Sequence, residues 1–492
     1  MPCKRTICFI IIALSLKLIH AVRQRGTVIR FDFLGILLIT YYLSLITYQM
    51  STQPKIIVLD DDPTGSQTVH SCLLLMQWDV ETLRLGLADN VPIFFILTNT
   101  RALTPTQAAD VTREVCQNLK SAIAAEGIKD FLVVSRSDST LRGHYPVETD
   151  VIATELGGFD AHFLTPAFFE GGRITRDSVH YLFIDGVEIP VHETEFARDS
   201  VFGYSHSYLP DYVEEKTGSK IKAEDVERFL LPDIRSGTQE RLLSLQGNQC
   251  GVVDGEKQAD LDIFCQDILA VAAEGKRFLF RSAASLLTSL AKLGKQPIPA
   301  EKMAEYKPTS KPGVVLVGSH VQKTTQQLGE LLKQPGVAPI EVDVVRLRDQ
   351  PGDREIMLQE ILSQAKEAYD AGKNPVIYTS RQELTFADVQ QRLDFGKQVS
   401  LLLMDVVRGL PQEISFLISK GGITSNDVLS TGLGLRSARL LGQILPGCSM
   451  VRTGESHPQF PNLPVVLFPG NVGDKDGLAT VYGRLSVDTP HA

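Results

Sequence analysis

The feature that most constrains the fold of this chain is an alternation of short apolar runs with longer amphipathic segments. Runs of Val, Ile, Leu and Phe are typical of strands buried in a parallel sheet, because helical crossovers cover both of its faces. The pattern therefore predicts an α/β protein. The predicted strands are Ile56–Leu59, Ile93–Leu97, Phe131–Val134, His162–Leu164, Phe278–Phe280, Val314–Val317, Ile340–Val342, Val376–Tyr378, Ser415–Ile418 and Val465–Leu467.

One helix between these strands carries signals at both of its ends. Thr104 is a good N-cap, Pro105 suits the first turn, and Gln107 completes a capping box. Gly127 suits the end of a helix because glycine adopts the left-handed conformation at little cost. We therefore predict a helix from Pro105 to about Glu126.

The segment between Gly294 and Pro312 separates two sets of predicted strands. It contains four prolines and several lysines, a composition typical of linkers. We predict two domains, each a mostly parallel sheet flanked by helices, with the active site in the cleft between them. The predicted parts are an N-terminal extension (1–50), a first domain (51–294), a linker (295–312) and a second domain (313–492). The polar, weakly periodic stretch 171–231 is interpreted as an insertion in the first domain.

The first fifty residues differ from the rest of the chain in charge. They contain six basic residues and one acidic residue, with apolar runs at Ile7–Ile19 and Phe33–Tyr48. Three interpretations remain open: a membrane anchor, a cleaved signal, or a start codon assigned too far upstream. We favour the last, with Met50 as the true start, because Met50 leads directly into the first predicted strand. Contact with a membrane is expected only if residues 1–50 are genuine.

The net charge and the cysteine content limit the kinds of partner and the cellular compartment that we expect for this protein. The net charge of −9 argues against nucleic acid as the main partner, because phosphate backbones attract basic surfaces. The seven cysteines include no CxxC pair, which disfavours a disulfide framework and a structural zinc site. A reducing cytoplasm is the expected location.

Three consecutive acids follow the first predicted strand. Asp60, Asp61 and Asp62 precede Pro63-Thr64-Gly65, so a buried strand delivers carboxylates to its own C-terminal end. In open α/β sheets, ligands bind at that edge. Because adjacent acids repel one another, we expect a cation, substrate hydroxyls or a shifted pKa at this position.

A second polar cluster, Ser135–His144, follows the strand Phe131–Val134. Arginine suits a carboxylate or a phosphate, and hydroxyl groups suit the oxygens of a polyol. The cluster predicts a site for a small anionic, hydroxylated molecule. Its candidate residues are Arg136, Asp138, Ser139, Thr140, Arg142 and Gly143.

Three glycine-containing turns follow strands in the second half. Glycine lets a backbone approach phosphate groups, and the N-terminus of the next helix supplies N–H donors. Neither a Walker A motif nor GxGxxG occurs. The candidate phosphate-binding residues are Gly318, Ser319, Gly421, Gly422, Thr424, Ser425, Gly470, Asn471 and Gly473.

One alternative function follows from the first acidic motif. Asp60, Asp62 and Thr64 fit the D-x-D-x-T signature of haloacid dehalogenase-type phosphatases, with Asp60 as nucleophile and Asp62 as general acid and base. The acidic motif at Asp474 and Asp476 lies too far along the chain for one such core. This alternative also leaves the Ser135–His144 cluster without a role.

From about Ile56 to Gly483 the sequence resembles the four-carbon acid sugar kinase family. The resemblance rests on Asp61–Gly65, Asp138–Gly143, Pro166–Arg173, the loop His192–Asp199, and the three glycine turns. It departs from the family pattern at five positions. These are Thr68 and Ile423 where acids are usual, Arg136 and Phe468 where lysine is usual, and His144 where asparagine is usual.

The resemblance implies ATP-dependent phosphorylation, with Mg²⁺, of a terminal hydroxyl on a four-carbon sugar acid. Asp61 or Asp62 would then act as base, and Arg142, with Arg136, would bind the acceptor carboxylate. Thr64, Gly65, Asp138, Ser139, Thr140 and Gly143 complete the expected acceptor site. The expected partners are the sugar acid and ATP, and a homodimer is an open assembly. A non-catalytic binding protein on the same fold is the remaining alternative.

Overall fold

The structure of the protein is a computed structural model that describes residues 53–63, 65–184, 186–382, 384–470 and 472–487. The described residues from Pro54 onward belong to one compact unit. The predictions for residues 1–50, including Met50, lie outside the described residues. Among the described residues, no helix is both long and apolar enough to cross a membrane.

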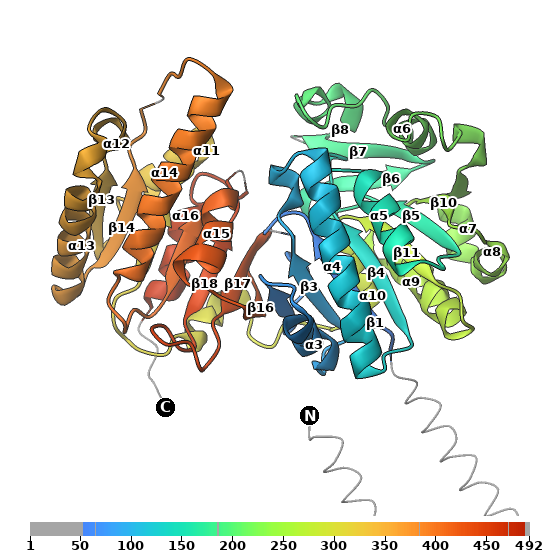
Figure 1. The fold of residues 1–492 in the computed structure, drawn as a ribbon, viewed down its shortest axis with the longest axis horizontal. Coiled ribbons are helices and arrows are strands. Elements are labelled where there is room, and N and C mark those ends of the chain that lie inside the picture. Colours follow the sequence, from blue (N-terminus) through green and yellow to red (C-terminus); the bar gives the residue numbers. More distant parts are fainter. Residues whose placement is uncertain (1–52, 64, 185, 383, 471, 488–492) are drawn as a thin grey trace, which may run out of the picture. The chain divides into compact units, whose positions relative to one another are not determined.

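Eight parallel strands form the N-terminal half of the main sheet (Figure 1). Their order is β2 (Leu73–Leu75), β3 (Ile93–Leu97), β1 (Lys55–Asp60), β4 (Phe131–Arg136), β11 (Phe278–Ser282), β5 (Ala161–Thr165), β10 (Gln249–Val253) and β9 (Glu227–Phe229). One face carries α3 (Val80–Ala88), α4 (Pro105–Glu126) and α5 (Val147–Leu156). The other carries α7 (Leu231–Ser236), α8 (Gln239–Ser244), α9 (Gln258–Ala273) and α10 (Ala284–Ala291).

Five parallel strands form the main part of the C-terminal half. Their order is β13 (Val337–Val342), β14 (Asn374–Thr379), β12 (Val314–Val317), β15 (Leu417–Lys420) and β18 (Pro464–Phe468). One face packs on α11 (Gln322–Leu331) and α16 (Gly477–Ser486). The other packs on α12 (Val344–Asp349), α13 (Arg354–Asp370) and α14 (Val389–Arg408), and α15 (Gly422–Asp427) follows β15. The two halves are thus mostly parallel sheets covered by helices, as predicted.

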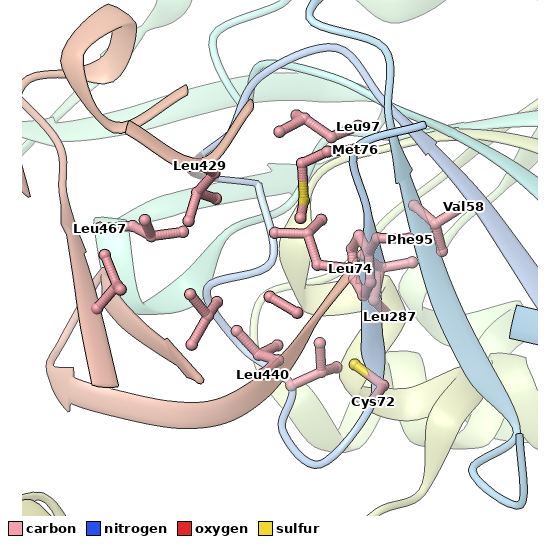
Figure 2. Packing of buried hydrophobic residues seen from close by; sticks show 14 of the residues in the cluster. Val58, Cys72, Leu74, Met76, Phe95, Leu97, Leu287, Leu429, Leu440 and Leu467 are labelled. Atoms are coloured by element: carbon pink, nitrogen blue, oxygen red, sulfur yellow. The ribbon is translucent and has the colours of Figure 1, made fainter. Parts of the chain in front are cut away.

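The two halves share one continuous sheet of 15 strands, which the sequence did not predict. The hairpin of β16 (Ser437–Leu445) and β17 (Cys448–Arg452) extends the sheet beyond β18, and β16 pairs antiparallel with β2. Figure 2 shows the packing beneath this junction, where Leu74 of β2, Leu440 of β16 and Leu287 of α10 belong to one buried cluster. Pairing between strands so far apart in the chain depends on tertiary packing rather than on local pattern.

The predicted strands are all confirmed, but the last but one begins and ends later in the sequence than predicted. Ser415–Ile418 was expected, whereas β15 spans Leu417–Lys420. The helix predicted at Pro105–Glu126 is α4, with the Thr104–Gln107 capping box in place and Gly127 left-handed at φ 64°. The predicted linker contains a short 3₁₀ helix, Ala300–Tyr306.

Most of the stretch interpreted as an insertion folds into a small sheet of its own, but its last strand, β9, belongs to the main sheet. The small sheet comprises β6 (Arg173–Arg176), β7 (Val179–Ile184) and β8 (Val187–Pro190), followed by α6 (Leu209–Lys216). Aromatic side chains from this region, Tyr204 and Tyr212, pack in a buried cluster with Leu141 and Tyr145 from the main domain. The insertion therefore lies against the polar segment that follows β4.

Candidate active site

Asp60 is at the C-terminal end of β1 and is enclosed by the protein. Its side chain is 1% exposed, and Arg136 of the neighbouring strand β4 contacts it at 3.3 Å. Burial raises the pKa of Asp60 to about 7, although Arg136 opposes the shift. A Cβ atom on Gly65 would lie 2.1 Å from the Asp60 carboxylate oxygens, so only glycine fits there. Asp60 is thus a buried acid whose carboxylate pairs with Arg136.

Asp61 and Asp62 share one arginine that the sequence analysis missed. Arg101 Nη2 lies 2.5 Å from Asp61 Oδ1, and Arg101 Nη1 lies 3.0 Å from Asp62 Oδ2. Burial alone would lower the pKa of Arg101, but Asp61, Asp62 and Asp138 outweigh it and raise that pKa. The Asp62 side chain is 24% exposed and that of Asp61 is 2% exposed. Because Arg101 follows β3, which is adjacent to β1, its position at a strand end was the available signal.

A network of buried hydrogen bonds holds the Asp61 carboxylate in place. Ser137 Oγ donates to Asp61 Oδ2 at 2.6 Å, and Arg281 Nη2 of β11 donates to Ser137 Oγ at 2.6 Å. Arg281 Nη1 also donates to Glu148 Oε2 of α5 at 2.6 Å, and Thr100 Oγ1 donates to Glu148 Oε1 at 2.5 Å. Arg281 and Glu148 were not predicted, because neither belongs to a local motif.

The segment Asp138–Gly143 is a tight turn that only a glycine can close. Gly143 has φ 122°, and a Cβ there would lie 2.4 Å from Ser137 Oγ and 2.5 Å from Arg281 Nη2. Within the turn, Arg142 Nε donates to Asp138 at 2.7 Å, and Thr140 Oγ1 also donates to Asp138. The turn therefore presents its charges in a fixed arrangement.

Three side chains of the insertion hold this turn by its backbone carbonyls. Tyr204 donates to the Thr140 carbonyl at 2.7 Å, and Tyr212 donates to the Leu141 carbonyl at 2.8 Å. His180 Nε2 lies 2.7 Å from the Ser139 carbonyl. Burial lowers the pKa of His180 to about 4, so the imidazole is neutral at pH 7 and donates through Nε2–H. The insertion thus positions the predicted acceptor residues.

Arg142 is the most exposed arginine of the cluster, with a side chain that is 26% exposed, against 19% for Arg101. Its guanidinium lies 4.9 Å from the Phe196 ring centre and 3.7 Å from Asp199, so the predicted loop His192–Asp199 does meet the cluster. Burial would raise the pKa of Asp138, but Arg101 and Arg142 hold it well below its usual range. A small pocket here is lined by Ser137, Asp138, Leu141, Arg142, Leu164, Pro166, Tyr212, Arg281 and Ser282.

Several buried polar atoms beside this pocket have no hydrogen-bond partner among the residues that the structure describes. They are Arg136 Nε, Ser282 Oγ and Thr165 Oγ1. Arg136 of β4 is in register with Ser282 of β11, which is in register with Thr165 of β5. They therefore form a row along the C-terminal ends of three adjacent strands, where buried polar groups call for a polar partner.

The three glycine turns of the C-terminal half come together at one edge of the sheet. β12, β15 and β18 are adjacent and parallel, so their C-terminal ends meet. A Cβ on Gly318 would lie 2.2 Å from Thr424 Oγ1, one on Gly421 would lie 3.0 Å from Ser319 Cβ, and one on Gly470 would lie 3.4 Å from Ser319 Oγ. Glycine is required at Gly318 because any side chain would displace Thr424.

Two of the predicted phosphate-binding residues pack against other parts of this half. Ser425 is fully buried, and its Oγ lies 2.9 Å from Ser419 Oγ. A Cβ on Gly473 would lie 3.3 Å from Gln327 Nε2 of α11. Gly422 has open space around its Cα. Thr64 and Asn471, both predicted site residues, lie outside the described residues.

Two cations at this edge were not among the predicted site residues. Arg381, just after β14, donates through Nη1 to the Ser319 carbonyl at 2.6 Å. Lys420, the last residue of β15, donates through Nζ to the Pro469 carbonyl at 2.5 Å and to the Gly470 carbonyl at 3.1 Å. Positive charge therefore lies beside the glycine turns, as an anion site requires.

Among the described residues, no group of three or more His, Cys, Asp or Glu side chains is arranged to hold a metal ion. The acids after β1 instead form ion pairs with Arg101 and Arg136.

Comparison with known proteins agrees with this division of the chain. A sugar-binding N-terminal domain family matches residues 56–290, and a nucleotide-binding C-terminal domain family matches residues 314–478. A 3-oxo-tetronate kinase from Pectobacterium atrosepticum is 26% identical over 443 residues, covering 86% of this chain and 98% of that protein. A D-threonate kinase from Bordetella bronchiseptica is 30% identical over 166 residues, covering 32% of this chain and 38% of that protein.

A solved structure from Haemophilus influenzae shares the fold. Its TM-score is 0.60 at 20% identity, and the match covers 87% of this chain and 100% of that one. The two matched domain families, together with the kinases that align with them, account for both halves of the chain. The protein therefore belongs to the four-carbon acid sugar kinase family and is a phosphotransferase with an alcohol group as acceptor.

Proposed function

We propose that the protein uses ATP to phosphorylate a terminal hydroxyl of a four-carbon sugar acid of the threonate, erythronate or 3-oxo-tetronate type. The main support for this proposal is that the protein contains two sites with complementary chemistry. Carboxylates and an exposed arginine gather at strand ends in one half, and three glycine turns meet at strand ends in the other. A related 3-oxo-tetronate kinase that aligns over 98% of its length supports the choice of substrate class.

In the acceptor half, Arg142 binds the carboxylate of the sugar acid. Its side chain is partly exposed, whereas Arg136 is enclosed beside Asp60. Ser139, Thr140 and Asp138 lie within the same fixed turn and offer hydrogen bonds to the hydroxyls of the acid. Arginine and hydroxyl groups are suited to a polyhydroxy acid.

Asp62 is the base that accepts the proton of the attacking hydroxyl. Its carboxylate is 24% exposed, whereas that of Asp61 is 2% exposed and is committed to Arg101 and Ser137. Asp61 instead fixes Arg101, which in turn orients Asp62. Positioning and charge neutralisation account for most of the catalysis in phosphoryl transfer, because the transition state is loose.

In the nucleotide half, the turns at Gly318, Gly421 and Gly470 receive the phosphates of ATP. The turns suit such a ligand because they follow three adjacent parallel strands, and a side chain at Gly318 would collide with Thr424. Mg²⁺, when bound with ATP, would neutralise phosphate charge. Closure of the two domains over both substrates would exclude water and prevent hydrolysis of ATP. Cytoplasmic location and a homodimer remain predictions.

An ADP-release assay on the full chain tests this function. ATP and Mg²⁺ are supplied with D- and L-threonate, D- and L-erythronate, 3-oxo acids and larger aldonates. ADP release that depends on one four-carbon acid is the expected result, and it would identify the substrate. Release with none of the acids, accompanied by phosphate release from a sugar phosphate, would favour the phosphatase alternative. That alternative requires Asp60 as nucleophile, yet Asp60 is 1% exposed against Gly65.

The variant Asp62→Asn tests whether Asp62 acts as the base without contributing to nucleotide binding. The variant should lose turnover while binding ATP with nearly unchanged affinity. Asp110→Asn is a matched control, because Asp110 lies on α4 with a side chain that is 67% exposed. Loss of ATP binding in Asp62→Asn would show that this acid belongs to the other half-site. Full turnover in the variant would exclude Asp62 as base.

A further inference from the structure

The nucleotide half contains a buried lysine whose surroundings differ from those of an ordinary core residue. Lys420 is the last residue of β15, and Phe468 is its register partner on β18. Its ammonium nitrogen lies 4.1 Å from the centre of the Phe468 ring, and the residue is 0% exposed. Lysine is rarely buried to this extent unless it is paired.

The partners of this ammonium are carbonyls rather than carboxylates. Lys420 Nζ donates to the carbonyls of Pro469 and Gly470, and among the described residues no acid forms an ion pair with it. The titratable groups that act on it are Lys323 of α11 and Cys448 of β17. Burial lowers the pKa of Lys420 to about 7; Cys448 opposes this shift and Lys323 adds to it. A buried cation without a counter-ion is stabilised by an incoming anion.

The carbonyls that Lys420 holds belong to the turn that meets the other two glycine turns. The Gly470 carbonyl accepts hydrogen bonds from Lys420 and from Thr324 Oγ1, the latter at 3.0 Å. The Cα of Gly470 faces Ser319, which precedes α11. An ammonium has three N–H donors, and two carbonyls accept from this one. The third N–H remains for an anion or for water.

We propose that Lys420 is a positioning residue for the nucleotide: its side-chain amine holds the Pro469–Gly470 turn and takes up a proton, becoming an ammonium, when the phosphates bind. The inference rests on the proposed function, because it takes the glycine turns as the phosphate site. At pH 8 most Lys420 side chains in the nucleotide-free protein are neutral. Phosphate charge stabilises the ammonium form, so binding draws a proton from solvent. Bound nucleotide and charged Lys420 thus stabilise each other.

Calorimetric titration of the full-length protein with MgADP at pH 8 tests this inference. Performing it in HEPES and in Tris, whose ionisation enthalpies differ, gives the number of protons taken up. We expect a value close to one per nucleotide, and an affinity that falls by up to about tenfold per pH unit above pH 7. Lys420→Met should abolish proton uptake and weaken binding roughly 10- to 100-fold, the effect of losing a hydrogen-bonding charge.

Two further variants distinguish proton linkage from a loss of structure. Lys420→Arg keeps the charge at pH 8, so it should bind without proton uptake and with little dependence on pH. Lys323→Met removes an exposed neighbouring positive charge, which lowers the pKa of Lys420 less than burial does, so most of the uptake should remain. If Lys420→Met fails to fold, the number of protons that the wild-type protein takes up on binding MgADP still tests the inference.

Each outcome has a distinct meaning. Wild-type protein that binds MgADP without proton uptake overturns this inference and leaves the proposed function standing. Unchanged affinity and uptake in Lys420→Met would also overturn it. Wild-type protein that binds no nucleotide overturns the proposed function, and this inference with it.

Discussion

The buried pair of Arg281 and Glu148 offers a quantitative test of how Asp61 is supported. The side chains are 8% and 6% exposed, and Arg281 Nη1 lies 2.6 Å from Glu148 Oε2. Arg281→Met would leave the Glu148 carboxylate buried without a counter-charge. Removing one partner of a buried pair typically costs about 3–5 kcal/mol. We therefore expect Arg281→Met to lower the free energy of unfolding by an amount in that range.

A double-mutant cycle with Glu148→Gln isolates the interaction between the two groups. Glutamine keeps an oxygen for the Thr100 hydroxyl, which donates to Glu148 Oε1. Because the double variant removes both charges, it should be more stable than the sum of the single changes predicts, by about 1–3 kcal/mol. An isosteric neutral pair need not be less stable than a buried ion pair.

Urea unfolding followed by fluorescence measures these free energies. The chain has one tryptophan, Trp78, which packs against the cluster that contains residues of α3, α4 and α5. Its signal therefore reports on the half of the molecule that contains the pair. Destabilisations that add to within about 0.5 kcal/mol would refute the reasoning, because they would show that the two charges do not interact across 2.6 Å.

Three other changes test the acceptor site. Gly143→Ala places a Cβ 2.4 Å from Ser137 Oγ at φ 122°. We therefore expect the free energy of unfolding, measured in urea, to fall by about 2–4 kcal/mol and kcat to be lower. A variant as stable as the wild type would contradict this crowding. Arg101→Gln removes the cation shared by Asp61 and Asp62, so kcat should fall about 100-fold or more in steady-state assays while the Kd for ATP stays within about twofold. For Asp60, the folded-state pKa of about 7 exceeds the ordinary 3.8, so the folded state holds the extra proton and stability falls as pH rises between those values. Asp60→Asn should therefore gain stability relative to wild type from about pH 4 to 7, and parallel stability curves would show that Asp60 titrates normally.

The sequence was most informative where function depends on short motifs at strand ends. Asp61, Asp62, Asp138 and Arg142 lie in one cluster, and the turns at Gly318, Gly421 and Gly470 meet. Both results follow from the rule that neighbouring parallel strands end at one edge. Arg136 was expected to bind the acceptor, but register places it beside Asp60. A motif specifies residue types, and register specifies which of them face each other.

The residues that the sequence analysis missed are those that act from other segments. Arg101 contacts Asp61 from the turn after β3, and Arg281 of β11 reaches Asp61 through Ser137. Tyr204 and Tyr212 contact the turn from the insertion. Phe468 stands where the family resemblance led us to expect lysine. The structure places Lys420 of the adjacent strand in register with it, with the ammonium over its ring. A contact between two neighbouring strands of this kind cannot be predicted from the sequence of either segment alone.

The sequence by itself determined the local elements and their chemistry. Apolar runs specified the buried strands, Thr104 and Gly127 specified the ends of α4, and adjacent acids and glycines marked the two candidate sites. Only the tertiary structure decided that β16 joins β2 in one sheet, that Asp60 is enclosed while Asp62 is partly exposed, and which arginine pairs with which acid. The physical reason is that hydrophobic periodicity and capping act within a few residues, whereas strand pairing, burial and charge pairing depend on segments brought together by packing.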